Sequence, residues 1–231
     1  MKILIVAATK AEVGPLHKVL ESSLQQDPLQ TKFFFRGIEI HLLITGAGMT
    51  STAFLLGKTL SLYSYNFVLN LGLCGSFEKK FRIGDVLHVK EDCFSEMGAE
   101  DGEKFLSVFD LGLAENNGHP FTNGVLENTG DIKNRVIRAL PVVKGISVNT
   151  VHGNDESIRK TVKRFHPQIE SMEGAAFLFS CLMSDVPCAQ IRSVSNYVEK
   201  RNKDIWNIPL AIETLHKKTM EILDSFSTYG N

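Results

Sequence analysis

Apolar and polar positions follow two patterns along the chain. Continuous apolar runs of strand length, typical of strands buried on both faces of a sheet, begin with the run at 2–8. Segments with apolar residues at steps of three and four, typical of amphipathic helices, follow most of these runs. The patterns predict strands at 2–8, 33–35, 38–44, 66–71, 83–89, 142–151 and 189–198, and helices at 9–24, 50–62, 132–140, 155–165, 169–183 and 209–226. Strands that alternate with helices predict an α/β fold.

The chain is organised around the stretch 169–183. Six apolar or small residues recur there at helical spacing and predict a helix face packed against a larger body: Met172, Ala175, Ala176, Phe179, Leu182 and Met183. Glu173 falls in the first turn, where the free N–H groups and the dipole of a helix start stabilise a carboxylate. The same carboxylate, beside the flexible Met172, could instead hold the two adjacent hydroxyls of a ribose. The residues leave both interpretations open.

Two predicted strands end in loops of small residues. These loops are Gly46-Ala47-Gly48 and Gly72-Leu73-Cys74-Gly75-Ser76. Small residues let the backbone approach a ligand, and the carboxyl ends of parallel strands share one edge of a sheet. The sequence therefore predicts a pocket at that edge. It is not a dinucleotide site, because Ser51 stands where the third glycine of that fingerprint belongs.

Several polar side chains also fall at predicted strand ends. Glu12 lies in the turn after the first strand, and His152 belongs to a polar patch after the strand at 142–151. Arg192, Ser195 and Asn196 lie where the strand that starts at 189 turns polar. The alternatives to ligand groups are a solvated first-turn carboxylate for Glu12 and an exposed loop histidine for His152.

The segment 91–127 has no regular pattern and is rich in Gly, Asn, Asp and Phe. Long irregular segments in compact enzymes are often lids or partner contacts, and some are plain surface. We expect this segment to contribute to a pocket or to a subunit contact, with a solvated surface as the alternative.

Composition narrows the class of protein. The chain has 231 residues, 43% of them hydrophobic, which is enough for the full core of a single domain over 1–231. Its 25 basic and 26 acidic residues are interspersed, which argues against nucleic acid and for a small molecule as the partner. No apolar run approaches the roughly 18 residues of a membrane span, and no signal-peptide cleavage region follows the first apolar run. The four cysteines lack the paired spacing of a zinc site, so we expect reduced thiols, a cytoplasmic location and no metal.

Six motifs follow one another in order. They are Glu12 after the first strand, Gly46-Ala47-Gly48, Gly72-Leu73-Cys74-Gly75, Ile83-Gly84-Asp85-Val86, Ser171-Met172-Glu173-Gly174-Ala175-Ala176 and Arg192-Ser193-Val194-Ser195-Asn196. Their order and spacing resemble the nucleoside phosphorylase/nucleosidase superfamily over nearly the whole chain. Within it, the segments 147–151, 170–176 and 201–209 are similar to the family of futalosine hydrolases, next to the methylthioadenosine nucleosidases. The resemblance implies a mixed central sheet flanked by helices and hydrolysis of an N-glycosidic bond.

The resemblance also implies roles for the matched residues. Glu12 would orient and deprotonate the attacking water, aided by Arg192. Met172 would lie against the sugar, and Glu173 would accept hydrogen bonds from the ribose 2′ and 3′ hydroxyls. The backbone segment that holds the base would be Thr150 and Val151. The second glycine loop would line the substrate pocket with Leu73, Cys74 and Gly75.

Asn196 departs from the pattern of the adenine-specific nucleosidases, which carry an aspartic acid there. An aspartic acid can donate a proton to purine N7 and accept from an amine at C6, whereas an amide offers donors for N7 or a 6-oxo group but no proton to transfer. A 6-oxopurine such as the hypoxanthine of futalosine therefore fits better. A mispaired buried amide would cost about 1–3 kcal/mol, a roughly ten- to hundredfold discrimination.

The expected activity is hydrolysis of futalosine to hypoxanthine and dehypoxanthine futalosine, in menaquinone biosynthesis. The alternatives among enzymes are an adenine-releasing nucleosidase, acting on methylthioadenosine, adenosylhomocysteine or aminodeoxyfutalosine, and a purine nucleoside phosphorylase. A non-catalytic nucleoside sensor is the alternative outside enzymes, against which Glu12 and Arg192 argue. Phosphate is not the expected co-substrate, because Lys10 stands where the phosphorylases carry an arginine. We expect no cofactor and a homodimer or higher homo-oligomer.

Overall fold

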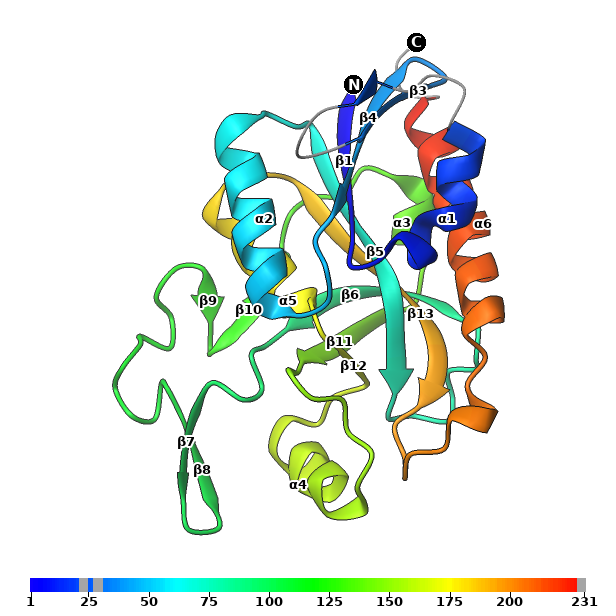
Figure 1. The fold of residues 1–231 in the computed structure, drawn as a ribbon. Helices are drawn as coiled ribbons and strands as arrows, with labels where there is room; N and C mark the ends of the chain where they lie inside the picture. Colours follow the sequence, from blue (N-terminus) through cyan, green and yellow to red (C-terminus); the bar gives the residue numbers. More distant parts are fainter. Residues whose placement is uncertain (21–24, 27–30, 228–231) are drawn as a thin grey trace.

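A mixed β-sheet runs through the centre of the molecule, and helices cover both of its faces (Figure 1). The computed structural model describes residues 1–20, 25–26 and 31–227. The strands of the sheet are β1 (Lys2–Ala7), β2 (Gln25–Gln26), β3 (Thr31–Phe35), β4 (Ile38–Ile44), β5 (Phe67–Ser76), β6 (Val86–Asp92), β9 (Phe121–Thr122), β10 (Val125–Glu127), β11 (Val142–Ser147), β12 (Ile169–Ser171) and β13 (Cys188–Tyr197). The helices are α1 (Lys10–Leu20), α2 (Met49–Leu62), α3 (Arg135–Arg138), α4 (Asp155–Phe165), α5 (Gly174–Met183) and α6 (Ile208–Ser227), with a 3₁₀ turn at Lys203–Ile205. This architecture confirms the predicted fold class.

Five strands of the sheet close into a ring. β5 pairs in parallel with β13 and antiparallel with β12, and β12 continues in parallel to β11. β11 pairs in parallel with β6, which pairs antiparallel with β13 and so completes the ring. All five strands contribute to one cluster of buried side chains: Cys74, Leu87, Val89, Val143, Ile169 and Val194. From this ring, β1, β4, β3 and β2 extend the sheet on one side, and β10 and β9 on the other.

Two hydrophobic cores lie between the sheet and its helices. β1 explains why both exist, because its alternate side chains point to opposite faces. Ile3 and Ile5 enter the core shared with α1 and α6, whereas Leu4 and Val6 enter the core shared with α2 and α5. Figure 1 shows the two helix layers on either side of β1. A strand buried on both faces must be apolar throughout, as the sequence at 2–8 is.

Most predicted elements are confirmed, with small differences at their ends. The hairpin predicted around Arg36 and Gly37 is β3 and β4, and both residues of the turn have positive φ, 47° and 79°. The helix predicted at 155–165 is α4, whose first turn is capped by the side chain of Asn154. The helix predicted at 9–24 is α1, and its last predicted residues, 21–24, lie outside the described residues.

The structure corrects two predictions around the site. The stretch 169–183 is not one helix, because residues 169–171 form β12, which the ring requires between β5 and β11. α5 starts at Gly174, and it is buried nearly all round rather than on one face. The loop predicted at 72–76 is also wrong, because β5 continues to Ser76 with partners on both edges.

The segment 91–127 is more regular than predicted. It contains the end of β6, the short strands β9 and β10, and a separate hairpin of β7 (Gly98–Asp101) and β8 (Lys104–Ser107). The hairpin lies beside α4 (Figure 1), and the Arg164 guanidinium of that helix lies over the Phe105 ring at 4.1 Å. Two other predicted elements are shorter than expected, since the strand at 142–151 ends at Ser147 and the helix at 132–140 is reduced to α3.

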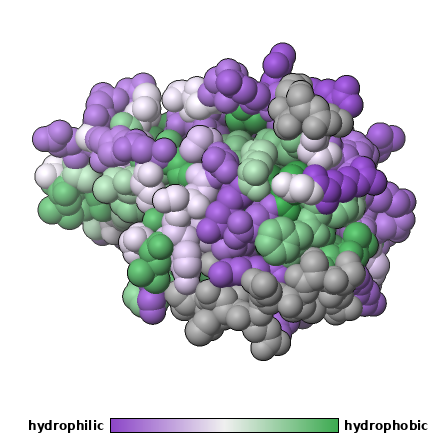
Figure 2. Space-filling model, turned by 90° about the horizontal axis from the view of Figure 1, so that it is seen from above, coloured by the Kyte–Doolittle hydropathy of each residue, from purple (hydrophilic) through white to green (hydrophobic). Residues whose placement is uncertain are grey.

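The surface is mixed in character. Seen from above, hydrophilic side chains cover much of the molecule and hydrophobic ones form separate groups (Figure 2). The four cysteines are free thiols. Within the described ranges, no helix combines the length and the hydropathy that crossing a membrane requires, and no cluster of three or more metal-ligating side chains occurs.

Candidate active site

A cavity of about 310 Å³ lies at the carboxyl ends of β1, β4 and β13. Its lining comes from widely separated parts of the chain: Ala8, Thr9, Glu12, Ala47, Leu73, Cys74, Gly75, Val151, His152, Glu170, Ser171, Met172, Glu173, Ser195, Asn196, Arg201 and Trp206. A larger cavity, about 450 Å³, lies elsewhere and is lined by the 127–132 segment and the end of α5. That cavity contains none of the predicted site residues. The smaller one is the candidate active site, because polar groups from many elements converge on it.

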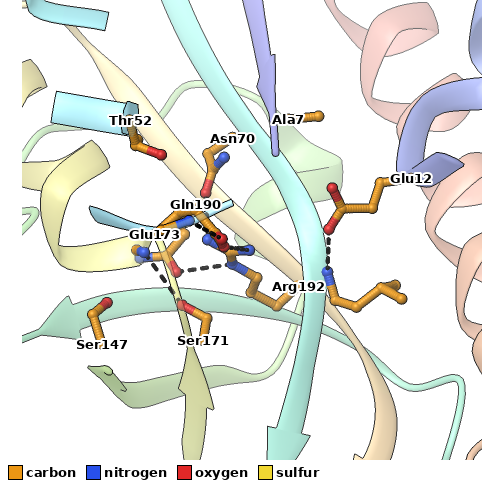
Figure 3. Close-up of polar contacts among 12 residues, drawn as sticks. Ala7, Glu12, Thr52, Asn70, Ser147, Ser171, Glu173, Gln190 and Arg192 are labelled. Atoms are coloured by element: carbon orange, nitrogen blue, oxygen red, sulfur yellow. Dashed lines mark hydrogen bonds and ion pairs between the residues drawn. The ribbon is translucent and has the colours of Figure 1, made fainter. Parts of the chain in front are cut away.

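Glu12 occupies one side of the cavity, in the first turn of α1. Its Oε2 accepts hydrogen bonds from the Thr9 N–H at 2.8 Å and the Thr9 hydroxyl at 3.1 Å. Its Oε1 accepts from the Leu73 N–H of β5 at 3.4 Å (Figure 3). The carboxylate therefore stabilises the helix start and also lines the cavity, and its function as a ligand group stays a prediction.

Glu173 lies on the other side of β5 from Glu12 in Figure 3 and directly precedes α5. It is buried, with 6% of the residue exposed, and it lines the cavity. Its Oε1 accepts from the Gly48 N–H at 3.0 Å, and its Oε2 pairs with Arg192 Nη1 at 3.4 Å. Gly48 can present its N–H in this way because it has φ of 97°, a conformation that favours glycine. The first glycine loop thus holds a carboxylate of the protein.

Arg192 is almost completely buried and does not line the cavity. Its Nη2 donates to Asn70 Oδ1 at 2.7 Å and its Nε to Gln190 Oε1 at 3.1 Å. These two bonds fix the guanidinium in the orientation in which it pairs with Glu173 (Figure 3). The guanidinium reaches this position because residue 72 is glycine, where a Cβ would collide with it. The same Cβ would lie 3.2 Å from Glu12 Oε1, so the guanidinium lies near Glu12 as well as against Glu173. The role of Arg192 as an aid to Glu12 stays a prediction.

A second buried carboxylate completes this network and was not predicted. Asp92, 1% exposed, accepts from Gln190 Nε2 at 3.1 Å and from the Ser147 hydroxyl at 3.1 Å. Burial raises the pKa of Asp92 to about 6, while the hydrogen bond from Gln190 and the charge of Arg192 oppose the rise. One signal in the sequence points to this network: Asn70 and Gln190 are polar residues inside apolar strands.

The opposite end of the cavity carries an amide and a third lining carboxylate. The Asn196 side chain accepts from the Ser195 hydroxyl at 2.8 Å and donates to the Tyr197 carbonyl at 3.1 Å. Glu170, which sequence reasoning missed, accepts from the backbone N–H of His152 at 3.0 Å. His152 is therefore not a solvated loop residue. Of the predicted base-holding pair, Val151 lines the cavity, whereas Thr150 is exposed and is not among the lining residues.

The second predicted loop lines the cavity as part of β5. Leu73, Cys74 and Gly75 all contribute, as does Met172 from the segment before α5. Burial raises the pKa of the Cys74 thiol to about 12, so it is protonated at neutral pH and is not a thiolate nucleophile. The cavity thus combines Glu12 and Glu173 at one end with Asn196 and Glu170 at the other.

The chain belongs to the phosphorylase superfamily, whose sequence profile matches residues 2–226. Among proteins of known function, it is 27% identical to the futalosine hydrolase of Thermus thermophilus over 191 residues, which cover 81% of this chain and 83% of that one. It is 26% identical to a 5′-methylthioadenosine/S-adenosylhomocysteine nucleosidase of Buchnera aphidicola over 204 residues, 85% of each chain. The fold is similar to that of futalosine hydrolase of Helicobacter pylori, with a TM-score of 0.81, 21% identity and 97% coverage of both chains.

Proposed function

We propose that this protein hydrolyses the N-glycosidic bond of futalosine and releases hypoxanthine and dehypoxanthine futalosine, a step of menaquinone biosynthesis. The observation that carries the proposal is the convergence of Glu12, Glu173 and Asn196 on one cavity. Relatives that are futalosine hydrolases support the choice of substrate. An adenine-releasing nucleosidase is the second candidate, because methylthioadenosine/adenosylhomocysteine nucleosidases are also relatives.

The sugar end of the cavity supplies two carboxylates with different tasks. Glu173, fixed by the Gly48 N–H and by Arg192, accepts from the ribose 2′ and 3′ hydroxyls and so stabilises positive charge that develops at C1′. Glu12, fixed by Thr9 and Leu73, positions a water and takes its proton as the water oxygen bonds to C1′. Met172 packs against the sugar. Arg192, which pairs with Glu173 and whose guanidinium lies near Glu12, supports both carboxylates.

The base end receives the electrons of the broken bond. As the bond from C1′ to N9 breaks, its electron pair moves into the purine, and negative charge develops toward N7 and O6. The Asn196 amide donates a hydrogen bond to that edge, and the Val151 backbone segment borders the base. A proton from solvent then neutralises the hypoxanthine.

Water rather than phosphate is the proposed nucleophile. The sugar end carries Glu12 and Glu173, and Arg201 is the one cationic side chain among the residues that line the cavity in the described structure. Its backbone N–H bonds to the Gly153 carbonyl, next to His152 at the base end. The charge of Glu173 is compensated by Arg192. Glu12 accepts from neutral groups of Thr9 and Leu73, and its negative charge repels a phosphate dianion.

Product analysis tests the proposal. Purified protein is incubated with futalosine, its 6-amino counterpart and methylthioadenosine, each with and without phosphate, and the released base and sugar are identified by chromatography and mass spectrometry. We expect hypoxanthine and a free ribosyl product from futalosine at a rate that phosphate does not change. Faster release of adenine would favour the second candidate, and a ribosyl phosphate product would favour a phosphorylase.

Assembly and location are part of the same proposal. Exposed large apolar side chains include Phe54 (66%) and Leu62 (57%) on α2 and Leu113 (76%) in the 91–127 segment. They support a homodimer or higher homo-oligomer in which these surfaces are covered, which light scattering after size exclusion measures. The four free thiols support a cytoplasmic location.

A further inference from the structure

Three neighbouring strands place Glu170, Gly75 and Asn196 at one register. Glu170 of β12 pairs with Gly75 of β5, and Asn196 of β13 pairs with the same glycine from the other edge. Two interstrand spacings separate the outer backbones by about 10 Å. A Cβ on Gly75 would lie 2.9 Å from Val198 Cγ2, 3.2 Å from Asn196 Nδ2 and 3.5 Å from Glu170 Cγ. The glycine therefore allows an amide and a carboxylate that both line the cavity to come close to each other.

The Glu170 carboxylate is held by two hydrogen bonds from one residue. It is 3% exposed and accepts from the His152 backbone N–H at 3.0 Å and from His152 Nδ1 at 2.5 Å. The other ring nitrogen of His152 lies 2.8 Å from the Thr161 hydroxyl of α4, which fixes the ring. A carboxylate has about four acceptor positions, so these two bonds leave acceptor capacity on Glu170.

The Asn196 amide is oriented on the other side of Gly75. Its oxygen is occupied by the Ser195 hydroxyl, and one of its two N–H groups by the Tyr197 carbonyl. Its second N–H is the remaining donor. The base end of the cavity thus offers a donor from β13 and an acceptor from β12.

We propose that Glu170 is a specificity-determining residue that accepts the N1–H of a 6-oxopurine while Asn196 donates to its O6 or N7. This inference rests on the proposed function and identifies a second recognition contact in the same site. A 6-oxopurine presents two acceptors followed by a donor along this edge, which matches an amide donor and a carboxylate acceptor. Adenine carries a lone pair at N1, which an ionised carboxylate repels and cannot satisfy. A site built to accept an N–H rejects an analogue that lacks it.

The variant Glu170→Gln tests the assignment. A glutamine keeps the size of the side chain but is neutral, so it accepts the N1–H of hypoxanthine less strongly and can donate an N–H to the N1 of adenine. We expect the ratio of kcat/KM for futalosine to kcat/KM for its 6-amino counterpart to fall about ten- to a hundredfold. The matched control is Glu199→Gln, a carboxylate paired with Lys79 outside the cavity, which should leave the ratio unchanged. An unchanged ratio in a folded Glu170→Gln protein would overturn the inference.

Binding of free bases provides a readout that does not depend on turnover. Calorimetry should give tighter binding of hypoxanthine than of adenine or 1-methylhypoxanthine to the unmodified protein, since the methyl group replaces the N1 hydrogen. Glu170→Gln should weaken hypoxanthine binding at least tenfold and leave 1-methylhypoxanthine nearly unaffected. If Glu170→Gln does not fold, Thr161→Val, which frees the His152 ring, should shift the same ratio in the same direction by a smaller factor.

The two proposals can fail separately. If the unmodified protein releases no base from futalosine but still prefers hypoxanthine in a Glu170-dependent manner, the proposed reaction fails and the recognition contact stands. If it hydrolyses futalosine but binds hypoxanthine equally well with and without the Glu170 carboxylate, the reaction stands and the recognition contact fails.

Discussion

Arg192→Met removes the guanidinium at the centre of the buried network and keeps most of the volume of the side chain. Three hydrogen bonds are lost, to Glu173, Asn70 and Gln190. Two buried carboxylates, Glu173 and Asp92, are left without this cation near them. A methionine offers no donor in return, so the acceptors around it stay unsatisfied.

The expected loss of stability follows from this burial. Removal of one partner from a buried ion pair costs about 3–5 kcal/mol, because the remaining charge is no longer compensated. Arg192 is 1% exposed, so solvent cannot replace the lost bonds. We expect Arg192→Met to lower the free energy of unfolding by about 4 kcal/mol, a large part of the roughly 5–15 kcal/mol of a typical domain.

Urea unfolding at neutral pH, followed by circular dichroism, measures this loss. The control is Arg82→Met, because the Arg82 side chain is 85% exposed and its pair with Asp85 spans 3.8 Å. An exposed pair contributes less than about 1 kcal/mol. The loss for Arg192→Met should shrink toward about pH 5, where protonation of Asp92 removes one uncompensated charge. A loss no greater than that of the control would refute the reasoning.

Three further predictions concern single residues. Glu12→Gln should reduce base release at least about a hundredfold, because the amide takes no proton from water, while its oxygen still caps α1; near-normal turnover with an unchanged Tm would contradict the role. Burial raises the pKa of Asp92 from 3.8 to about 6, so the folded state binds this proton more tightly than the unfolded chain. The resulting stabilisation, present below about pH 4, is lost as pH rises through 6, and relative to Asp92→Asn the unmodified protein should lose about 3 kcal/mol of unfolding free energy over that interval; parallel pH profiles would exclude it. Gly48→Ala should cost about 1–2 kcal/mol because φ is 97°, whereas Gly57→Ala inside α2, with open space around it, should be neutral or stabilising in thermal melts; equal effects would argue against strain at Gly48.

The sequence predicted the elements whose pattern is local. β1 is a continuous apolar run, and α4 has a capping asparagine and a charged solvent face, so propensity and burial agree at each. The sequence also predicted the paired strands on either side of Arg36 and Gly37, because a break at a glycine separates two alternating segments. Glu12, Glu173 and Asn196 were placed at strand and helix ends, and those ends meet at the cavity.

The remaining features depend on partners that are distant in sequence. Residues 169–171 look like the start of a helix because helical spacing continues through them, and only pairing with β5 and β11 makes them a strand. Glu170 could not be identified as a cavity residue while it was assigned to that helix. The position of Arg192 depends on Asn70 and Gln190 in buried strands, and no local sequence pattern predicts such a contact.

The closed ring of β5, β12, β11, β6 and β13 limits how the base end can change. Because β5 is hydrogen-bonded along both edges at Gly75, β12 and β13 cannot move apart or slide without breaking paired backbone groups. The distance between the backbones of residues 170 and 196 is therefore fixed. New base preferences in such a scaffold would arise by exchange of these two side chains. A pair of substitutions would then convert one nucleosidase into another without redesign of the backbone.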